Sequence, residues 1–303
     1  MNQKILDQYL EFSQYTNPGL YKDMLRNLPD KIEDLGLLVR KQLIHRLDLD
    51  NANNVSGANL GFDNAAKVPW HRQCEDDNFP TVPAILAELY RRDGAGFITD
   101  RAPKNKLVLT CRFVAILTAS ILKSKGIPAR VRVGFAPYIG RFGGRSVVHQ
   151  VNQYWSNQEK RWIIIDVDAS LNRLYFNPYD MPEGSFDFPA DAWLNVRSGK
   201  EDGKRFCHWE IAGYPALALI ATQFFHDFHS LMNSEIIYLH VPEKFGYKNF
   251  GELAEKELAG IDKLACLMQN PDENFEKLRE VWETNQDFRR LTGASLDIAH
   301  YHR

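Results

Sequence analysis

The chain has 303 residues, of which 44% are hydrophobic and 25% are charged, the balance of a folded globular protein and not of a disordered or fibrous one. Its 37 Lys and Arg residues nearly cancel its 39 Asp and Glu residues, and the net charge of −2 excludes a general attraction to nucleic acid or to anionic membranes. The four cysteines, at positions 74, 111, 207 and 266, are too scattered for a disulfide scaffold, so free thiols in a cytoplasmic protein are expected.

Helical patterns dominate the first part of the chain. Apolar residues at 32, 35, 38, 39 and 43 recur at the spacing of one helix face, which predicts a helix between Ile32 and Leu47. Residues 51–82 are rich in Asn, Asp, Gly and Pro, as is typical of a connector, and a short helix is expected from Val82 to Arg92. We therefore predict an N-terminal helical extension and connector over residues 1–75.

The middle of the chain reads as a helix followed by strands. An apolar run begins at Cys111, residues 129–135 alternate like a half-exposed strand, and the segments SVVHQVNQYW (146–155) and RWIIID (161–166) read as two further strands joined by a polar turn. From residue 190 onward the pattern is mostly helical again. This order predicts an α+β fold in which a helix packs on an antiparallel sheet. We expect a core over residues 76–190 and a C-terminal helical extension over 191–303, in one compact unit.

Cys111 lies where the apolar helix is expected to begin. Thr110 can cap that helix, which leaves Cys111 in its first turn. There the helix dipole and the free backbone N–H groups favour an anion, so we expect a lowered thiol pKa. The same N–H groups could hold the oxyanion that forms when the sulfur attacks a carbonyl. The position therefore suits a nucleophile.

A histidine and an aspartate are expected to face each other on the two later strands. If residues 156–159 form the turn, residue 155 pairs with 160 and residue 151 with 164, and His149 then lies directly across from Asp166. An imidazole and a carboxylate at that spacing form a plausible pair of general base and orienting acid. Asp168 lies on the same predicted face and is the less favoured candidate for the acid.

Each of these residues also has a simpler explanation. A cysteine at a helix start is often an inert small apolar side chain, and a histidine on an apolar strand is often a satisfied core residue. Asp166 could simply end its strand. The joint arrangement, a helix start followed by a facing His and Asp, favours Cys111, His149 and Asp166 as catalytic residues.

The same segments resemble the core of the transglutaminase-like superfamily: CRFVAILTASILKSKGIPARVRVGF (111–135), HQVNQYW (149–155) and RWIIIDVD (161–168). The resemblance implies a papain-like fold with the cysteine on a helix and the histidine and aspartate on adjacent strands. It implies that Cys111 is the nucleophile, His149 the base and Asp166, four residues after Trp162, the orienting acid. Residues 15–35 and 191–202 more loosely resemble flanks of stand-alone bacterial members, whose substrates are generally unassigned.

Differences from the family concern the substrate groove. Leu109 and Thr110 precede the cysteine where the family often has glycine, and Gln150 follows the histidine where an aromatic residue is common. Candidate substrate-binding residues are Gln150, then Trp70 and His71, which lie upstream where related folds place a groove wall or an oxyanion donor, and finally Arg112. Arg112 could bind a substrate carboxylate or form a structural ion pair.

Two histidines have the spacing of a metal-ligand pair. His226 and His229 lie at i and i+3 on an expected helix, but no third ligand is identifiable, and the half-buried end of an apolar helix is the favoured interpretation. The dipeptide Cys207-His208 is equally unsupported as a metal or redox site. No metal and no organic cofactor are expected.

We therefore expect a thiol-dependent enzyme that acts on an amide or ester through a Cys111 thioester, either as a hydrolase or, with an amine acceptor, as an acyltransferase. Its substrate is expected to be a small molecule, a peptide or a protein. The alternative is a catalytically silent binding module with the same fold. No nucleic-acid or membrane partner is expected, because the sequence lacks a basic stripe, the start lacks a signal peptide, and the longest apolar run (214–225) is too short to span a bilayer. The sequence does not specify the oligomeric state.

Overall fold

The structure, a computed structural model, describes residues 1–45, 70–72, 74–139, 143–171, 174–209, 213, 215–246 and 249–293. The chain divides into two compact units, both discontinuous in sequence. One unit, called the Cys111 unit below, comprises residues 6–131 and 150–182; the other, called the C-terminal unit, comprises residues 1–5, 132–149 and 183–303. These bounds do not follow the three consecutive segments expected from the sequence, because strands of the middle segment continue from one unit into the other.

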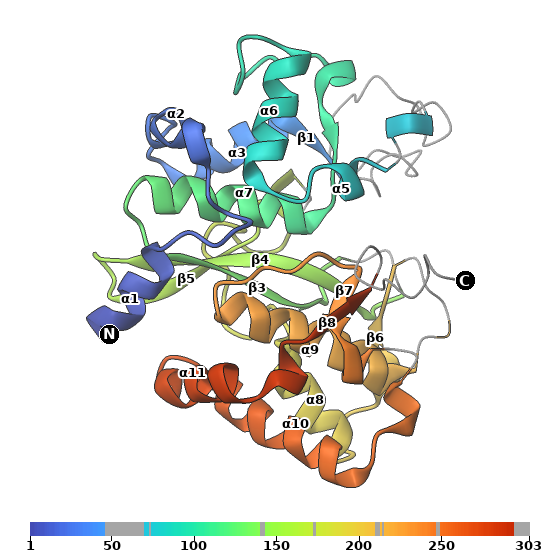
Figure 1. Cartoon of the computed structure of the whole chain (residues 1–303). Helices are drawn as coiled ribbons and strands as arrows, with labels where there is room; N and C mark the ends of the chain where they lie inside the picture. The colour runs from blue at the N-terminus through green and yellow to red at the C-terminus, as the bar shows by residue number, and fades with distance from the viewer. Residues whose placement is uncertain are drawn as a thin grey trace. The chain divides into compact units, whose positions relative to one another are not determined.

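The Cys111 unit is built around helix α7, Cys111–Ser124. Every residue of α7 is buried, and helices α2 (Lys22–Arg26), α3 (Ile32–Gln42) and α6 (Val82–Arg92) pack against it (Figure 1). The predicted helix at Cys111 is therefore confirmed. It ends before Gly126, whose φ of +77° lies in the left-handed region that glycine adopts without strain.

The main sheet has the strand order β3-β4-β5, and β6 pairs with β4. Its strands are β3 (Ala129–Ala136), β4 (Ser146–Ser156), β5 (Arg161–Ile165) and β6 (Phe206–Cys207). Strands β4 and β5 are antiparallel, as expected, and in the C-terminal unit β6 runs parallel to β4.

The register of the β4–β5 hairpin differs from the prediction. Ser156 pairs with Arg161 and Gln153 with Ile164, so each β4 residue faces a β5 residue two positions further along than expected. The turn has four residues, as predicted, but they are 157–160, and Lys160 closes it with a φ of +56°. A lysine at a left-handed position gives no turn signal in the sequence. The pairing ends at Asn152 and Ile165, before His149 and Asp166, so the predicted cross-strand pair of His149 and Asp166 is wrong.

A second, small sheet leads into α7. Strand β1 (Leu43–Ile44) runs parallel to β2 (Leu107–Val108), and the backbone N–H of Leu109 donates to the carbonyl of Ile44 at 3.0 Å. The helix predicted to run to Leu47 therefore ends at Gln42, because the next two residues pair with a strand. Of the connector predicted over 51–82, residues 51–69 lie outside the described residues, and α5 (Glu75–Asn78) is a short helix within it.

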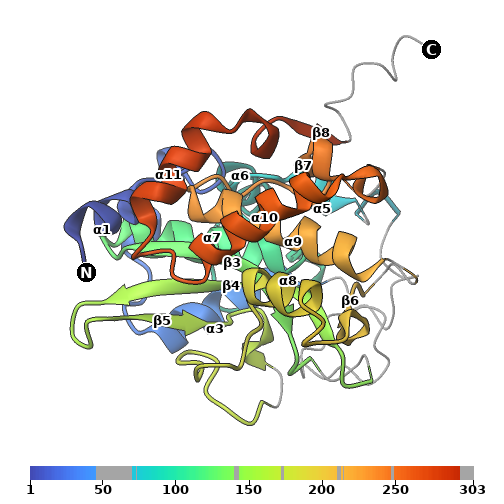
Figure 2. The same ribbon diagram turned by 90° about the horizontal axis from the view of Figure 1, so that it is seen from below.

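The C-terminal unit is mostly helical, as predicted for the end of the chain. Helix α8 (Pro189–Arg197) packs against both α9 (Ala216–Leu231) and α10 (Glu255–Met268), as Figure 2 shows, and α10 also contacts α11 (Phe275–Thr284). Strands β7 (His240–Pro242) and β8 (Leu291–Gly293) form an antiparallel pair. The core of this unit is rich in aromatic side chains, including the buried Phe224, Phe225 and Phe228 of α9.

A buried ion pair fastens α9 to strand β3 within the C-terminal unit. Arg132 donates from Nε and Nη2 to the two carboxylate oxygens of Asp227 at 2.9 and 2.8 Å, and the N–H of Val133 donates to the same carboxylate. Neither charged side chain is more than 4% exposed.

Together, the helices and strands of the two units make a mixed α and β fold, as the sequence predicted at that level. Among the residues described, no helix has the length and apolar character needed to cross a membrane.

Candidate active site

Cys111 is the first residue of α7 and directly follows the strand β2 and the residues Leu109 and Thr110. Thr110 occupies the N-cap position with an extended backbone, as expected from its position. Its side chain accepts no capping hydrogen bond from the helix, however, so the predicted side-chain cap is wrong. Cys111 is 8% exposed, and all four cysteines are free thiols.

Two arginines bind the carbonyl groups on the outer edge of the segment that leads to Cys111. Arg72 donates from Nη1 to the carbonyl of Lys104 at 3.0 Å and from Nη2 to that of Lys106. Arg92, at the end of α6, donates to the Lys106 carbonyl at 2.7 Å. Because alternate residues of a strand present their backbone groups to the same side, the Lys106 carbonyl faces away from β1, whereas the Lys104 carbonyl comes from the preceding 3-10 turn Pro103–Asn105.

Two consecutive carboxylates bind the amides further along the same edge. Oε2 of Glu75 accepts the N–H of Val108 at 2.5 Å, and Oδ1 of Asp76 accepts the N–H of Thr110 at 3.0 Å. Hydrogen bonds to charged groups each stabilise a fold by about 1.5–3 kcal/mol. The amide immediately before Cys111 is therefore held by a side chain of α5.

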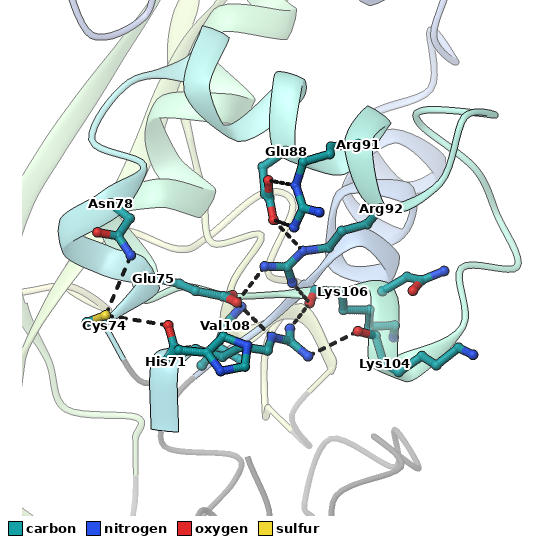
Figure 3. A network of polar contacts seen from close by, with 12 residues as sticks. His71, Cys74, Glu75, Asn78, Glu88, Arg91, Arg92, Lys104, Lys106 and Val108 are labelled. Carbon is teal, nitrogen blue, oxygen red and sulfur yellow. Dashed lines mark hydrogen bonds and ion pairs between the residues drawn. The ribbon is translucent and has the colours of Figure 1, made fainter. Parts of the chain in front are cut away.

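The four side chains form what we call the charged clamp: Arg72, Glu75, Asp76 and Arg92. Glu75 links its parts, because its Oε1 accepts from Arg92 at 2.6 Å (Figure 3) and also from Arg72 at 2.7 Å. Glu75 is 2% exposed. With β1 on one edge of β2 and the charged clamp on the other, the backbone that leads to the thiol is fixed from both sides.

Local sequence patterns do not predict the charged clamp. The only local signal is the acidic run Glu75-Asp76-Asp77, which resembles an ordinary solvated helix surface. Its backbone partners, Val108 and Thr110, lie more than 30 residues away along the chain, and single-sequence periodicity carries no information on such pairings.

Arg112 lies buried within the Cys111 unit. Its side chain is fully buried, its Nη1 donates to the carbonyl of Pro80 at 3.1 Å, and its guanidinium lies 5.0 Å from the ring centre of Tyr15. Its role in substrate binding stays a prediction from the sequence, and these two contacts, a backbone hydrogen bond and a cation–π contact, lie within the Cys111 unit.

The predicted base and acid belong to different units. His149, on β4, is a residue of the C-terminal unit, is 4% exposed, and has its ring centre 6.3 Å from that of Tyr138. Asp166 is a residue of the Cys111 unit and is 1% exposed, and its Oδ1 accepts the N–H of Ala169 at 2.9 Å. Their catalytic roles stay predictions from the sequence.

Asp168, the other candidate for the acid, forms a buried ion pair. Its Oδ1 accepts from Nη1 of Arg40 at 2.7 Å, and its Oδ2 lies 3.5 Å from Nε2 of His45. Both Arg40 and Asp168 have side chains less than 10% exposed. Because the loss of one member leaves the other buried without its opposite charge, this pair has a structural role in the Cys111 unit.

The remaining candidate substrate residues lie in different places. Gln150 is buried on β4. His71 is exposed in a short 3-10 helix, and it lines a cavity together with residues of α5 and α6. The side chain of Trp70 lies outside the described residues.

The two histidines of α9 bind backbone carbonyls. Nε2 of His226 lies 2.9 Å from the carbonyl oxygen of His240, and Nε2 of His229 lies 2.9 Å from that of Phe288. Burial lowers the pKa of His229 to about 4. No group of three or more His, Cys, Asp or Glu side chains within the described ranges could hold a metal ion. The favoured interpretation of a buried helix end therefore fits both histidines.

Cys207 and His208 show the ordinary effects of burial. Burial raises the pKa of the Cys207 thiol and lowers the pKa of the His208 imidazole, so both groups are held in their neutral forms. The His208 ring stacks on that of Trp209 with 5.9 Å between the ring centres. Neither group has the activated character of a redox or catalytic residue.

Comparisons of the chain with protein-family models, with curated proteins and with solved structures found no match.

Proposed function

We propose that the chain is a thiol-dependent acyl-transfer enzyme that acts on an amide or an ester through a thioester of Cys111. The observation that carries the proposal is the place of Cys111, at the first position of a 14-residue buried helix and directly after a strand that is fixed on both edges. At such a position the helix dipole stabilises the thiolate, and backbone N–H groups of the first turn can stabilise an oxyanion.

The other cysteines have different surroundings. Cys74 is exposed and precedes a helix of four residues, Cys207 lies in β6, and Cys266 is exposed on the last turns of α10. Of the four cysteines, Cys111 alone is the first residue of a long helix, and that helix is buried along its whole length. Its segment is also the one that resembles the nucleophile helix of the transglutaminase-like superfamily, and a papain-like core is part of the proposal.

The proposed reaction has two steps. His149 takes the thiol proton, and the Cys111 sulfur attacks the carbonyl carbon of the donor and forms a C–S bond. The C–N or C–O bond of the donor breaks, and the amine or alcohol leaves with the proton from His149. Water or an acceptor amine then attacks the thioester carbon, gives its proton to His149, and releases the acid or a new amide with the free thiolate. In this proposal Asp166 orients the imidazole of His149.

The substrate class proposed is a small-molecule, peptide or protein amide or ester, and water and an amine are both chemically competent acceptors. Four free thiols fit the cytoplasm as the proposed location. The proposed chemistry uses side chains alone, without a metal or an organic cofactor.

Intact-mass profiling with an activated-ester acyl donor tests the proposal. The wild-type chain should gain one acyl group, and hydroxylamine should remove it, as expected of a thioester. Cys111→Ala should gain none, whereas Cys266→Ala, which removes an exposed thiol, should behave like the wild type. Equal labelling of Cys111→Ala and wild type would overturn the proposal.

A binding module without turnover is the second candidate. It is favoured by the 8% exposure of Cys111 and by the Asp76 carboxylate on the amide of the preceding residue, because a negative charge near a thiol opposes the thiolate. The same labelling experiment separates the two candidates. A Cys111 that is labelled no faster than Cys266, combined with no turnover of any ester tested, would favour the binding module.

A further inference from the structure

A cavity of about 420 Å³ opens beside the charged clamp, within the Cys111 unit. Its lining comes from four consecutive parts of the chain: the 3-10 turn Trp70–Arg72, α5, α6 and the 3-10 turn Pro103–Asn105. The charged and polar members of this lining are Arg72, Glu75, Glu88, Arg91, Arg92 and Lys104, to which His71 and Asn78 are added.

The lining carries more positive than negative charge. Four permanent cations, three arginines and Lys104, face two carboxylates, those of Glu75 and Glu88. The hydrogen bond from Arg91 holds the pKa of Glu88 below its usual range, so this carboxylate stays ionised at neutral pH. The two carboxylates therefore leave a surplus of two positive charges around the cavity.

The carboxylates are already occupied by the arginines. Oε2 of Glu88 accepts from Nε of Arg91, and its Oε1 accepts from both Arg91 and Arg92, at 2.6 to 2.8 Å (Figure 3). Glu75 accepts from Arg92, from Arg72 and from a backbone amide. Both carboxylates thus serve to hold guanidinium groups in place.

The arginines of the lining have N–H groups beyond those that the two carboxylates bind. A guanidinium has five N–H groups, and Arg92 uses three of them in the hydrogen bonds that the described residues form, while Arg91 uses two. Arg92 is 10% exposed and fixed by three partners, whereas Arg91 is 71% exposed at the rim. Lys104 adds an exposed ammonium to the lining.

One cation of the lining also acts on a neighbour outside the cavity. Burial lowers the pKa of Arg101, and the positive charge of Arg92 lowers it further, partly opposed by the negative charge of Asp93.

We propose that this cavity binds an oxyanion, a phosphate or carboxylate group, between Arg92, Arg91 and Lys104. Planar guanidinium groups held by carboxylates and carbonyls match the two oxygens of such a group, and their rigidity lowers the entropy cost of binding. The site is independent of the proposed acyl-transfer reaction, since no residue of the proposed triad lines it.

Calorimetric titration of the full chain with inorganic phosphate, and separately with malonate, tests the site against sodium chloride at equal ionic strength. Saturable binding of phosphate or malonate is expected, and the stronger of the two identifies the preferred oxyanion. Lys104→Gln and Arg91→Gln should each weaken binding by about ten-fold, because each removes one charged donor.

Matched variants separate a built site from general charge effects. Lys200→Gln and Arg279→Gln make the same charge changes on exposed residues of the C-terminal unit, and Arg279, like Arg91, pairs with a glutamate of its own helix. These controls should bind within about two-fold of the wild type. Absence of saturable binding to the wild type, or equal weakening in the controls, would overturn the proposal. Both test side chains are exposed, and thermal unfolding of each variant verifies that it folds.

Discussion

Acidification is expected to destabilise the C-terminal unit through His229. The imidazole is 2% exposed, its Nε2 donates to the carbonyl of Phe288, and its buried Nδ1 has no hydrogen-bond partner among the described residues. The ring of Trp282 covers it edge-on at 4.8 Å. A second proton on this ring would have to enter a dry, aromatic site.

The magnitude follows from the pKa. Burial lowers the pKa of His229 from 6.5 to about 4, and the charges of His226 and Arg289 act in the same direction, while the bond to Phe288 partly opposes it. A difference of about 2.5 pKa units between the unfolded and folded states corresponds to about 3 kcal/mol. Above pH 6.5 the imidazole is neutral in both states, so the cost is absent. As the pH falls from 6.5 to 4 the unfolded state binds more protons, and the stability declines until the loss is complete below pH 4.

Urea unfolding between pH 7 and pH 4 measures this loss. His229→Gln keeps a donor that can reach the Phe288 carbonyl but cannot be protonated in this range. It should be less stable than the wild type at pH 7, since glutamine fills the site less well. At pH 4 the wild type has lost stability and the variant has not, so the difference in their free energies of unfolding should change in favour of the variant by about 3 kcal/mol. His71→Gln, which removes an exposed imidazole, is the control and should follow the wild-type curve. If His229→Gln lost stability with pH as steeply as the wild type, the neutral buried imidazole would not be the cause.

Three further predictions concern the Cys111 unit. Asp76→Ala should lower the free energy of unfolding by about 1–3 kcal/mol and speed hydrogen exchange of the amide before Cys111, Asp76→Asn should keep most of both, and the exposed neighbour Asp77→Ala should change neither by more than about 0.5 kcal/mol. Asp168→Asn should lower the free energy of unfolding in urea by about 3 kcal/mol or more, because the buried guanidinium of Arg40 loses its opposite charge. Asp166→Asn should act mainly on turnover, and the reverse pattern would exchange the two roles. Alkylation rates against pH should place the apparent pKa of Cys111 below the usual value of about 8.5, and a rate profile equal to that of exposed Cys266 would contradict an activated thiol.

Local patterns in the sequence predicted the elements whose cause is local. The helix from Cys111 and the strands β4 and β5 follow from local apolar patterns, and all three were predicted correctly. The alternation of residues 129–135 predicted a half-exposed strand, which is wrong, because β3 is buried along its whole length. The register of the β4–β5 hairpin was not predicted correctly, since it depends on where the turn closes, and Lys160 in a left-handed conformation gives no signal of that. A shift of one residue in the turn moved every cross-strand pair by two.

Long-range contacts account for the rest of what the sequence could not predict. Leu43 continues the apolar stripe of α3, yet it belongs to β1 because β2, some 60 residues later, offers it a partner. The complete burial of Arg112 beside Tyr15 could not be predicted either, because Tyr15 lies almost 100 residues earlier in the chain. From the sequence, Glu75 and Asp76 resemble ordinary surface acids, and only the structure shows that they bind backbone amides of the segment 108–110.

The charged clamp also affects how the small sheet meets other protein chains. The outer edge of a strand, with its row of unmet amides and carbonyls, is ordinarily a template on which a foreign strand can add and start aggregation. On β2 that row is already bound by two guanidinium groups and two carboxylates, and an incoming strand would have to displace all four. The charged clamp therefore protects β2 against strand addition as well as fixing the backbone that leads to Cys111.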